Sequence, residues 1–138
     1  MTTNTKPIGV AYEDQNIVGA DRILSDNELG YTAAAQGSVT QLTSKSTAVT
    51  LNKSAGVITM NNASLATATN ATFTLNNSLI SANDTVILTI AGGQTTPGSY
   101  NVFANSLSAG SVSITLRNIS GGSLSEAIVI NFALIHCV

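Results

Sequence analysis

Two adjacent residues near the C-terminus, His136 and Cys137, are the only histidine and the only cysteine of this chain of 138 residues. A Cys–His pair can act as nucleophile and base when the side chains face one another and a third group orients the base. Neighbouring residues on a strand point to opposite faces, which argues against such a pair here. A zinc site needs three or four ligands, and no other ligand residues cluster in the sequence. We therefore expect neither catalysis nor metal binding at this position.

Asp84 and Glu126 are the only carboxylates beyond residue 36, and each opens an expected strand. Two carboxylates could serve as general acid and base if both lay in one pocket. Nothing in their positions predicts this, so we expect solvent-facing charges at strand ends. The pair Gly92-Gly93 is followed by neither a lysine nor a helical pattern, which favours a turn over a phosphate-binding loop. We expect no enzymatic activity and no cofactor.

Aromatic residues, which carbohydrate sites on β-domains commonly use for stacking, are scarce. The chain has no Trp, three Tyr and three Phe. Phe73, Phe103 and Phe132 occupy apolar strand positions, which leaves Tyr100 as the one exposed platform expected after residue 36. A carbohydrate-binding β-module is therefore a weaker alternative to a structural role, and so is a small hydrolase.

The composition is apolar and nearly uncharged. Charged residues make up 9% of the chain, against about 25% in ordinary soluble domains. Thr, Ser and Asn replace them with 18, 16 and 14 residues. Such surfaces suit long-lived assemblies, because few charges must be desolvated when subunits meet. Five scattered basic residues and a net charge of −2 predict no nucleic-acid partner and no membrane surface.

Short segments with alternating apolar residues follow one another from residue 37 onward, and no long amphipathic helix interrupts them. In 111–118, Val112, Ile114 and Leu116 alternate with polar residues. The pattern predicts an all-β fold, an antiparallel β-sandwich of about eight strands, either jelly-roll or immunoglobulin-like. The expected strands are 38–43, 47–52, 56–61, 71–76, 84–90, 99–104, 111–118 and 126–135.

Three finer expectations follow from these segments. Val39 and Leu42 are the candidates for burial in the first one. Gly56 follows a short linker and is expected to provide the flexible backbone of a hairpin turn. The segment 126–135 is apolar at both alternating sets of positions, which is typical of a strand covered on both sides.

Residues 1–36 differ from the rest and are expected to form an extended N-terminal arm, joined to a β-sandwich domain at 37–138. They hold seven of the twelve charged residues and have no sustained period of 2 or 3.6. Isolated apolar residues could serve as anchors on a neighbouring molecule, although a flexible tail, or an extra segment packed on its own domain, is the other interpretation. They also lack the apolar core of a signal peptide, so we expect synthesis and folding in a cytoplasm without classical export.

The sequence of residues 37–138 resembles a domain of virion proteins from tailed bacteriophages. The resemblance lies in TSKSTAVTLNKSAGVITM and in the closing SLSEAIVINFALI, and PIGVAYEDQNIVGADRI resembles segments that precede this domain. It implies a structural role, either on the head as a decoration or cement protein, or on the tail apparatus. The family offers no catalytic or metal motif to carry over.

Residue pattern and resemblance together predict a decoration protein on the outer capsid surface of the virion. Its partners would be the major capsid protein and other copies of this chain, with a trimer favoured by analogy with other accessory virion proteins. A tail or fibre component active in assembly or host adsorption is the alternative. The residues expected to contact the capsid or other subunits are Tyr12, Ile17, Asp21, Arg22, Ile23, Glu28, Leu29 and Tyr31.

Overall fold

The computed structural model describes residues 19, 21, 22 and 24–137, and its regular elements are one 3-10 turn and eight strands. Between the strands the chain forms turns and loops, including 62–69, where Leu65 makes a single bridge with Leu124. The elements are η1 Ala33–Ala35, β1 Gln36–Thr40, β2 Val49–Thr50, β3 Ala55–Thr59, β4 Asn70–Asn76, β5 Thr85–Gly92, β6 Tyr100–Ser108, β7 Ser111–Asn118 and β8 Val129–Ile135.

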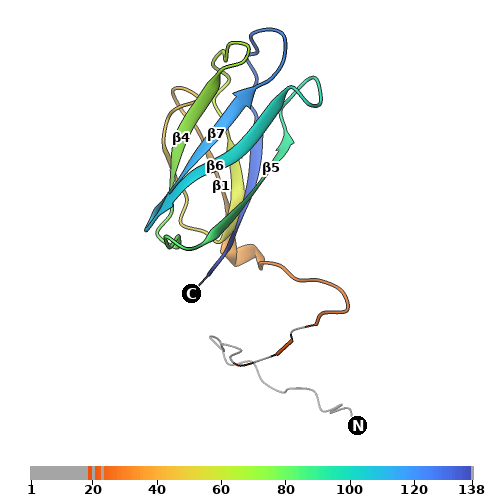
Figure 1. Ribbon diagram of the computed structural model, residues 1–138, viewed down its shortest axis with the longest axis vertical. Helices are drawn as coiled ribbons and strands as arrows, with labels where there is room; N and C mark the ends of the chain where they lie inside the picture. The colour runs from red at the N-terminus through yellow and green to blue at the C-terminus, as the bar shows by residue number, and fades with distance from the viewer. Residues whose placement is uncertain (1–18, 20, 23, 138) are drawn as a thin grey trace. The chain divides into compact units, whose positions relative to one another are not determined.

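Two four-stranded sheets pack face to face, which confirms the predicted all-β sandwich (Figure 1). Sheet A has the order β1-β3-β8-β5, and sheet B has the order β2-β4-β7-β6. Both sheets are mixed, because β1 pairs with β3 and β2 with β4 in parallel while the other pairs are antiparallel. The purely antiparallel expectation is therefore wrong. The first four strands alternate between the sheets, so strands that share a sheet are separated by two crossings and run the same way.

Alternation along each strand determines the core. In β7, Val112, Ile114 and Leu116 point inward as predicted, and Ile130, Phe132 and Leu134 of β8 meet them from the other sheet. Val86, Leu88 and Ile90 of β5 also face the core, while Ile87 faces outward, again as predicted. The period of 2 thus places each apolar set on the inner face of its own sheet.

The expected burial of Leu42 is wrong, since this side chain is 85% exposed. β1 ends at Thr40, and the chain then bends, so the alternation no longer applies. Gln41 takes the buried position instead and satisfies its amide with backbone groups. Its Nε2 donates to the carbonyls of Lys45 and Thr47, and its Oε1 accepts from the amide of Asn61.

Gly56 lies inside β3 rather than in a hairpin turn, so that expectation is also wrong. β2 and β3 belong to different sheets and form no hairpin. A Cβ at this position would lie 2.6 Å from the carbonyl oxygen of Gly37 and 2.8 Å from a methyl of Leu51. A glycine is required here because the backbone of β1 and the side chain of Leu51 approach too closely for any side chain.

The expectation that β8 is covered on both sides is wrong as well. β8 lies between β3 and β5 in sheet A, and its inward residues are buried. Its outward side chains include Asn131 and Ile135, and both are exposed. The apolar outward positions of β8 therefore lie on an uncovered sheet face.

The Gly56→Ala substitution tests the close approach of β1 and β3. Because the added methyl would meet backbone, we expect the free energy of unfolding to fall by about 2 kcal/mol or more. The Gly121→Ala substitution is the control, since a Cβ there meets nothing within 4 Å. Urea denaturation of both variants measures the difference, and equal midpoints would contradict the steric account.

Candidate functional site

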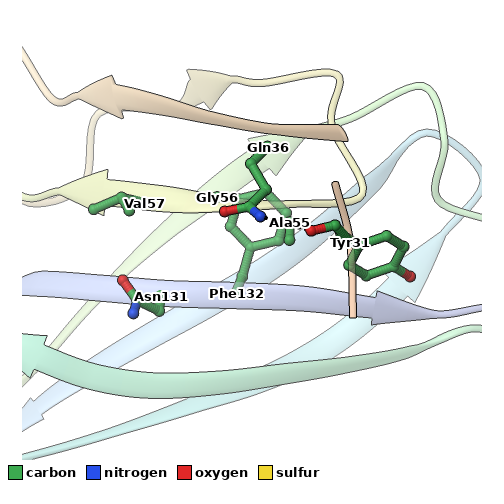
Figure 2. Close-up of a pocket in the computed structure, with 7 residues that line it drawn as sticks. All are labelled: Tyr31, Gln36, Ala55, Gly56, Val57, Asn131 and Phe132. Carbon is green, nitrogen blue, oxygen red and sulfur yellow. Dashed lines mark hydrogen bonds between the residues drawn. The ribbon is translucent and has the colours of Figure 1, made fainter. Parts of the chain in front are cut away.

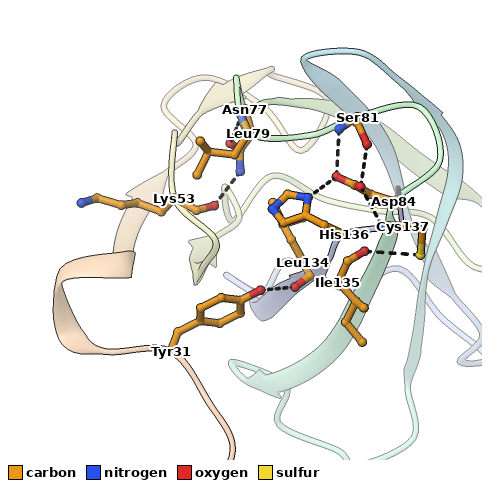
Figure 3. Close-up of polar contacts among 10 residues, drawn as sticks. All are labelled: Tyr31, Lys53, Asn77, Leu79, Ser81, Asp84, Leu134, Ile135, His136 and Cys137. Carbon is orange, nitrogen blue, oxygen red and sulfur yellow. Dashed lines mark hydrogen bonds and ion pairs between the residues drawn. The ribbon is translucent and has the colours of Figure 1, made fainter. Parts of the chain in front are cut away.

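Asp84 and His136 come together at one end of the sandwich. The carboxylate of Asp84 lies 2.9 Å from Nδ1 of His136 and accepts hydrogen bonds from the hydroxyl and amide of Ser81, at 2.6 and 2.8 Å. The amide of Cys137 donates to the same carboxylate (Figure 3). Hydrogen bonds from Ser81 are the main reason that the pKa of Asp84 falls to about 2. The expected solvent-facing charge is therefore wrong, because the carboxylate is buried and fastens the end of β8 to the start of β5.

Among the residues that the structure describes, the imidazole of His136 hydrogen-bonds to Asp84 and to no hydroxyl or thiol. Cys137 contributes its backbone amide to Asp84, and its thiol lies 3.9 Å from the carbonyl oxygen of Ile135. A hydrolytic triad needs the nucleophile within hydrogen-bond reach of the imidazole. The contacts of this cluster are those of a structural lock between two strand ends.

Glu126 occupies the opposite end of the sandwich, since it precedes β8 whereas Asp84 precedes the antiparallel β5. Its carboxylate accepts a hydrogen bond from the amide of Thr95 at 2.7 Å, which lowers its pKa. Its backbone carbonyl and that of Asn61 accept hydrogen bonds from the buried ammonium of Lys45. The two carboxylates of the β-domain therefore cannot act together.

Tyr100 is not the exposed platform that the sequence predicts, since it is only 4% exposed. It begins β6 with its side chain directed into the core, and its hydroxyl lies beside the Glu126 carboxylate. Burial, reinforced by that carboxylate, raises the pKa of the Tyr100 hydroxyl above its usual range. Phe103 on the same strand faces outward instead. The prediction had Tyr100 exposed and Phe103 buried, and the structure shows the reverse. The reason is that the inward-facing residues of β6 begin with Tyr100, its first residue.

Sheet A presents an outward face on which no side chain carries a charge. The register aligns rows of small polar and apolar side chains across β1, β3, β8 and β5. Ile87 and Ile135 are about half exposed on this face. Its outward residues are Gln36, Ser38, Thr40, Ala55, Val57, Thr59, Thr85, Ile87, Thr89, Ala91, Val129, Asn131, Ala133 and Ile135.

A shallow groove of about 220 Å³ lies on this face between Tyr31, Val57 and Asn131 (Figure 2). Its volume is smaller than the roughly 300–1,000 Å³ typical of small-molecule sites. Among the described residues, no group of three or more His, Cys, Asp or Glu side chains lies close enough to hold a metal ion. The described chain also contains no helix long and apolar enough to cross a bilayer. The groove suits contact with another protein surface better than capture of a small molecule.

Residues 31–36 are fastened to the β-domain. The hydroxyl of Tyr31 donates to the carbonyl of Leu134 (Figure 3), and Nζ of Lys53 donates to the carbonyl of Ala34 at 2.8 Å. The amide of Gln36 donates from Nε2 to the carbonyl of Tyr31 at 2.9 Å. The chain accordingly divides into compact units between Gly30 and Tyr31, six residues before the predicted boundary. The three alanines of η1, Ala33–Ala35, belong to this fastened segment.

The segment before Tyr31 keeps its apolar residues in solvent where it is described. Leu29 is 94% exposed and Leu24 is 79% exposed, and no regular secondary structure includes either. The charged residues of this segment are exposed too, namely Asp21, Arg22 and Glu28. Within the described part of the chain, none of the three forms an ion pair. The predicted contact residues Tyr12, Ile17 and Ile23 lie outside the described residues.

Neither a family model, nor a curated protein, nor a solved structure matches this chain.

The Asp84→Asn substitution tests the lock at the end of β8. The pKa of Asp84 is lower in the folded chain than its usual 3.8, so its contribution to stability is present above about pH 4 and is lost as the pH falls toward 2. We expect the variant to unfold at lower urea concentration at pH 7 and to lose this part of the acid dependence. Urea denaturation between pH 2 and 7 measures both effects, with Asp26→Asn as the exposed control. Parallel pH profiles of Asp84→Asn and the unmodified chain would contradict the lock.

Proposed function

We propose that this chain is a structural protein of a tailed-phage particle, which binds the outer capsid surface and stabilises the joints between capsomers. The observation that carries the proposal is the exposure of Leu24 and Leu29 on an irregular segment that precedes a well-packed β-domain in the chain. Exposed leucine side chains leave apolar surface in contact with water in the free chain. Covering that surface with a partner lowers the free energy, so exposed leucines favour binding. Arg22, Asp21 and Glu28 add polar groups around these anchors.

The fastened segment 31–36 supports a clamp rather than a loose tether. Hydrogen bonds from Tyr31 and Lys53 hold the C-terminal end of the arm on the β-domain, so tension on the arm is transmitted to the sandwich. A segment of 30 residues spans at most about 100 Å when fully extended. A domain of this size has a radius of gyration of only about 13 Å. An arm of that length can therefore reach across a joint to a neighbouring capsomer.

The uncharged face of sheet A supports association of the β-domains with one another. A surface without charge can meet its own copy with neither repulsion nor the desolvation of ions. Ile87 and Ile135 give this face half-exposed apolar side chains. The groove beside Tyr31 gives it a concave region in which a side chain of another copy could pack. We propose a trimer through this face, with the arms directed toward the shell. A catalytic role has no comparable support, since the Asp84–His136 pair lacks a nucleophile.

A double substitution, Leu24→Asp with Leu29→Asp, tests the arm. Because both side chains are exposed, we expect an unchanged free energy of unfolding and a loss of shell binding of about tenfold or more. The measurement is co-sedimentation of the purified chain with bare shells from the phage that encodes it. The control is Asp26→Asn with Asn27→Ala, which changes two exposed residues of the same segment but no anchor. Full binding by the double variant would contradict the proposed contact between the arm and the capsid. Binding of the unmodified chain only to isolated tails would favour the tail alternative.

The Ile87→Asp substitution combined with Ile135→Asp tests the trimer. We expect the unmodified chain to sediment as three chains of 14.1 kDa each and the variant to sediment as a monomer, because charges would be buried at the interface. Leu42→Asp is the control, since that leucine is exposed in a loop outside the face. Sedimentation equilibrium distinguishes the states. A trimer that survives the double substitution would remove sheet A from the interface.

A further inference from the structure

We infer that the outward face of sheet B, centred on Phe103, binds a neutral pyranose chain such as a cell-surface polysaccharide. This inference is independent of the capsid role, because it concerns the other sheet and other residues. The face is formed by β4, β7 and β6, which lie side by side (Figure 1). Its outward side chains are hydroxyls and amides, with Arg117 as the one charged group among them and Phe103 as the one aromatic ring.

Phe103 is exposed at a position where the fold does not require an aromatic residue. Its neighbours Val102 and Ala104 pack against the core, while Phe103 itself is 42% exposed. The residues aligned with it across the sheet are Thr115 and then Thr72, both polar. Thr72 is exposed, whereas Thr115 is only 1% exposed and is covered by neighbouring groups. The ring has no apolar partner in its row, and we expect its exposed part to stack on the C–H face of a sugar ring.

The polar groups around the ring are held in place by one another. The hydroxyls of Thr72 and Thr115 lie 2.6 Å apart, and the amide of Asn105 donates from Nδ2 to the Thr115 hydroxyl. These contacts fix the Asn105 amide beside Phe103 with its oxygen still able to accept a hydrogen bond. Groups fixed in advance lose less conformational entropy when a ligand binds.

A β-bulge widens the polar part of this face. The pairing of β6 with β7 shifts register between Ala104 and Ser106, and Leu107 returns to the inward side. The extra residue lets Asn105 and Ser106 both remain exposed, where strict alternation would turn one of them inward. Bulges of this kind commonly re-aim side chains next to binding sites.

One row away, Arg117 extends the hydrogen-bonding surface. Asn101 on β6 and Asn70 on β4 flank it in the register, and Nη1 of Arg117 donates to the Asn70 amide oxygen at 3.3 Å. Amide and guanidinium groups offer paired donors and acceptors to the vicinal hydroxyls of a sugar. A single cation among neutral groups favours a neutral sugar over a polyanion, which would require several basic residues.

The test is titration of the full chain, labelled with ¹⁵N, with neutral hexasaccharides of glucose, mannose, galactose and N-acetylglucosamine, followed by NMR. We expect one of them to shift the signals of β4, β6 and β7 saturably, with a dissociation constant on the order of millimolar. Phe103→Ala should weaken binding about tenfold, and Phe103→Tyr should retain it. Leu79→Ala, which removes a similarly exposed apolar residue elsewhere, should leave binding unchanged.

Three results would overturn the inference. No saturable shift with any of the four hexasaccharides would do so, as would shifts that persist unchanged in Phe103→Ala. A change of oligomeric state in Phe103→Ala would instead assign this face to contact between copies of the chain. Asn105→Ala keeps the test valid if the Phe103 variant proves unstable, because it removes the amide without touching the ring, and it should also weaken binding.

Discussion

Face-to-face packing of the two mixed sheets is the interaction on which the rest of this structure depends, because a chain with one cysteine has no disulfide to replace it. Every strand contributes its inward set to a single apolar core. The parallel pairs at the edges of both sheets require the chain to cross the sandwich repeatedly before β4. Those crossings bring Gly37 and Gly56 into backbone contact and bury Gln41 and Lys45 with their hydrogen bonds satisfied.

Using the inward residues for the core leaves two outer faces with different compositions. Sheet A exposes threonines, alanines and half-buried aliphatic residues without charge, and sheet B exposes hydroxyls and amides around Phe103. The two carboxylates of the β-domain are occupied at its opposite ends, Asp84 with His136 and Glu126 with Thr95. Both carboxylates therefore lie away from the two outer faces, which suits a protein proposed to work by contact rather than by chemistry.

The period of 2 in the sequence was sufficient to predict eight strands near their observed positions and the inward residues of β5 and β7. It could not predict which strands share a sheet, because pairing depends on crossings between distant segments. Gly56 illustrates this limit, since its close approach to Gly37 exists only once β1 and β3 are adjacent. Asp84 and His136 are 52 positions apart in the sequence, and nothing local to either residue predicts their contact. Phe103 is exposed because side chains alternate along β6 and its first residue, Tyr100, points inward, so the third residue after it points outward.

Immunogold electron microscopy of intact particles tests the proposal that this chain is a head protein of the virion. The antibody should be raised against residues 37–138, which contain most of the β-domain. If the proposal is right, gold will be distributed over the capsid surface. Gold confined to the tail or its fibres would contradict the claim and would make host adsorption the function to investigate.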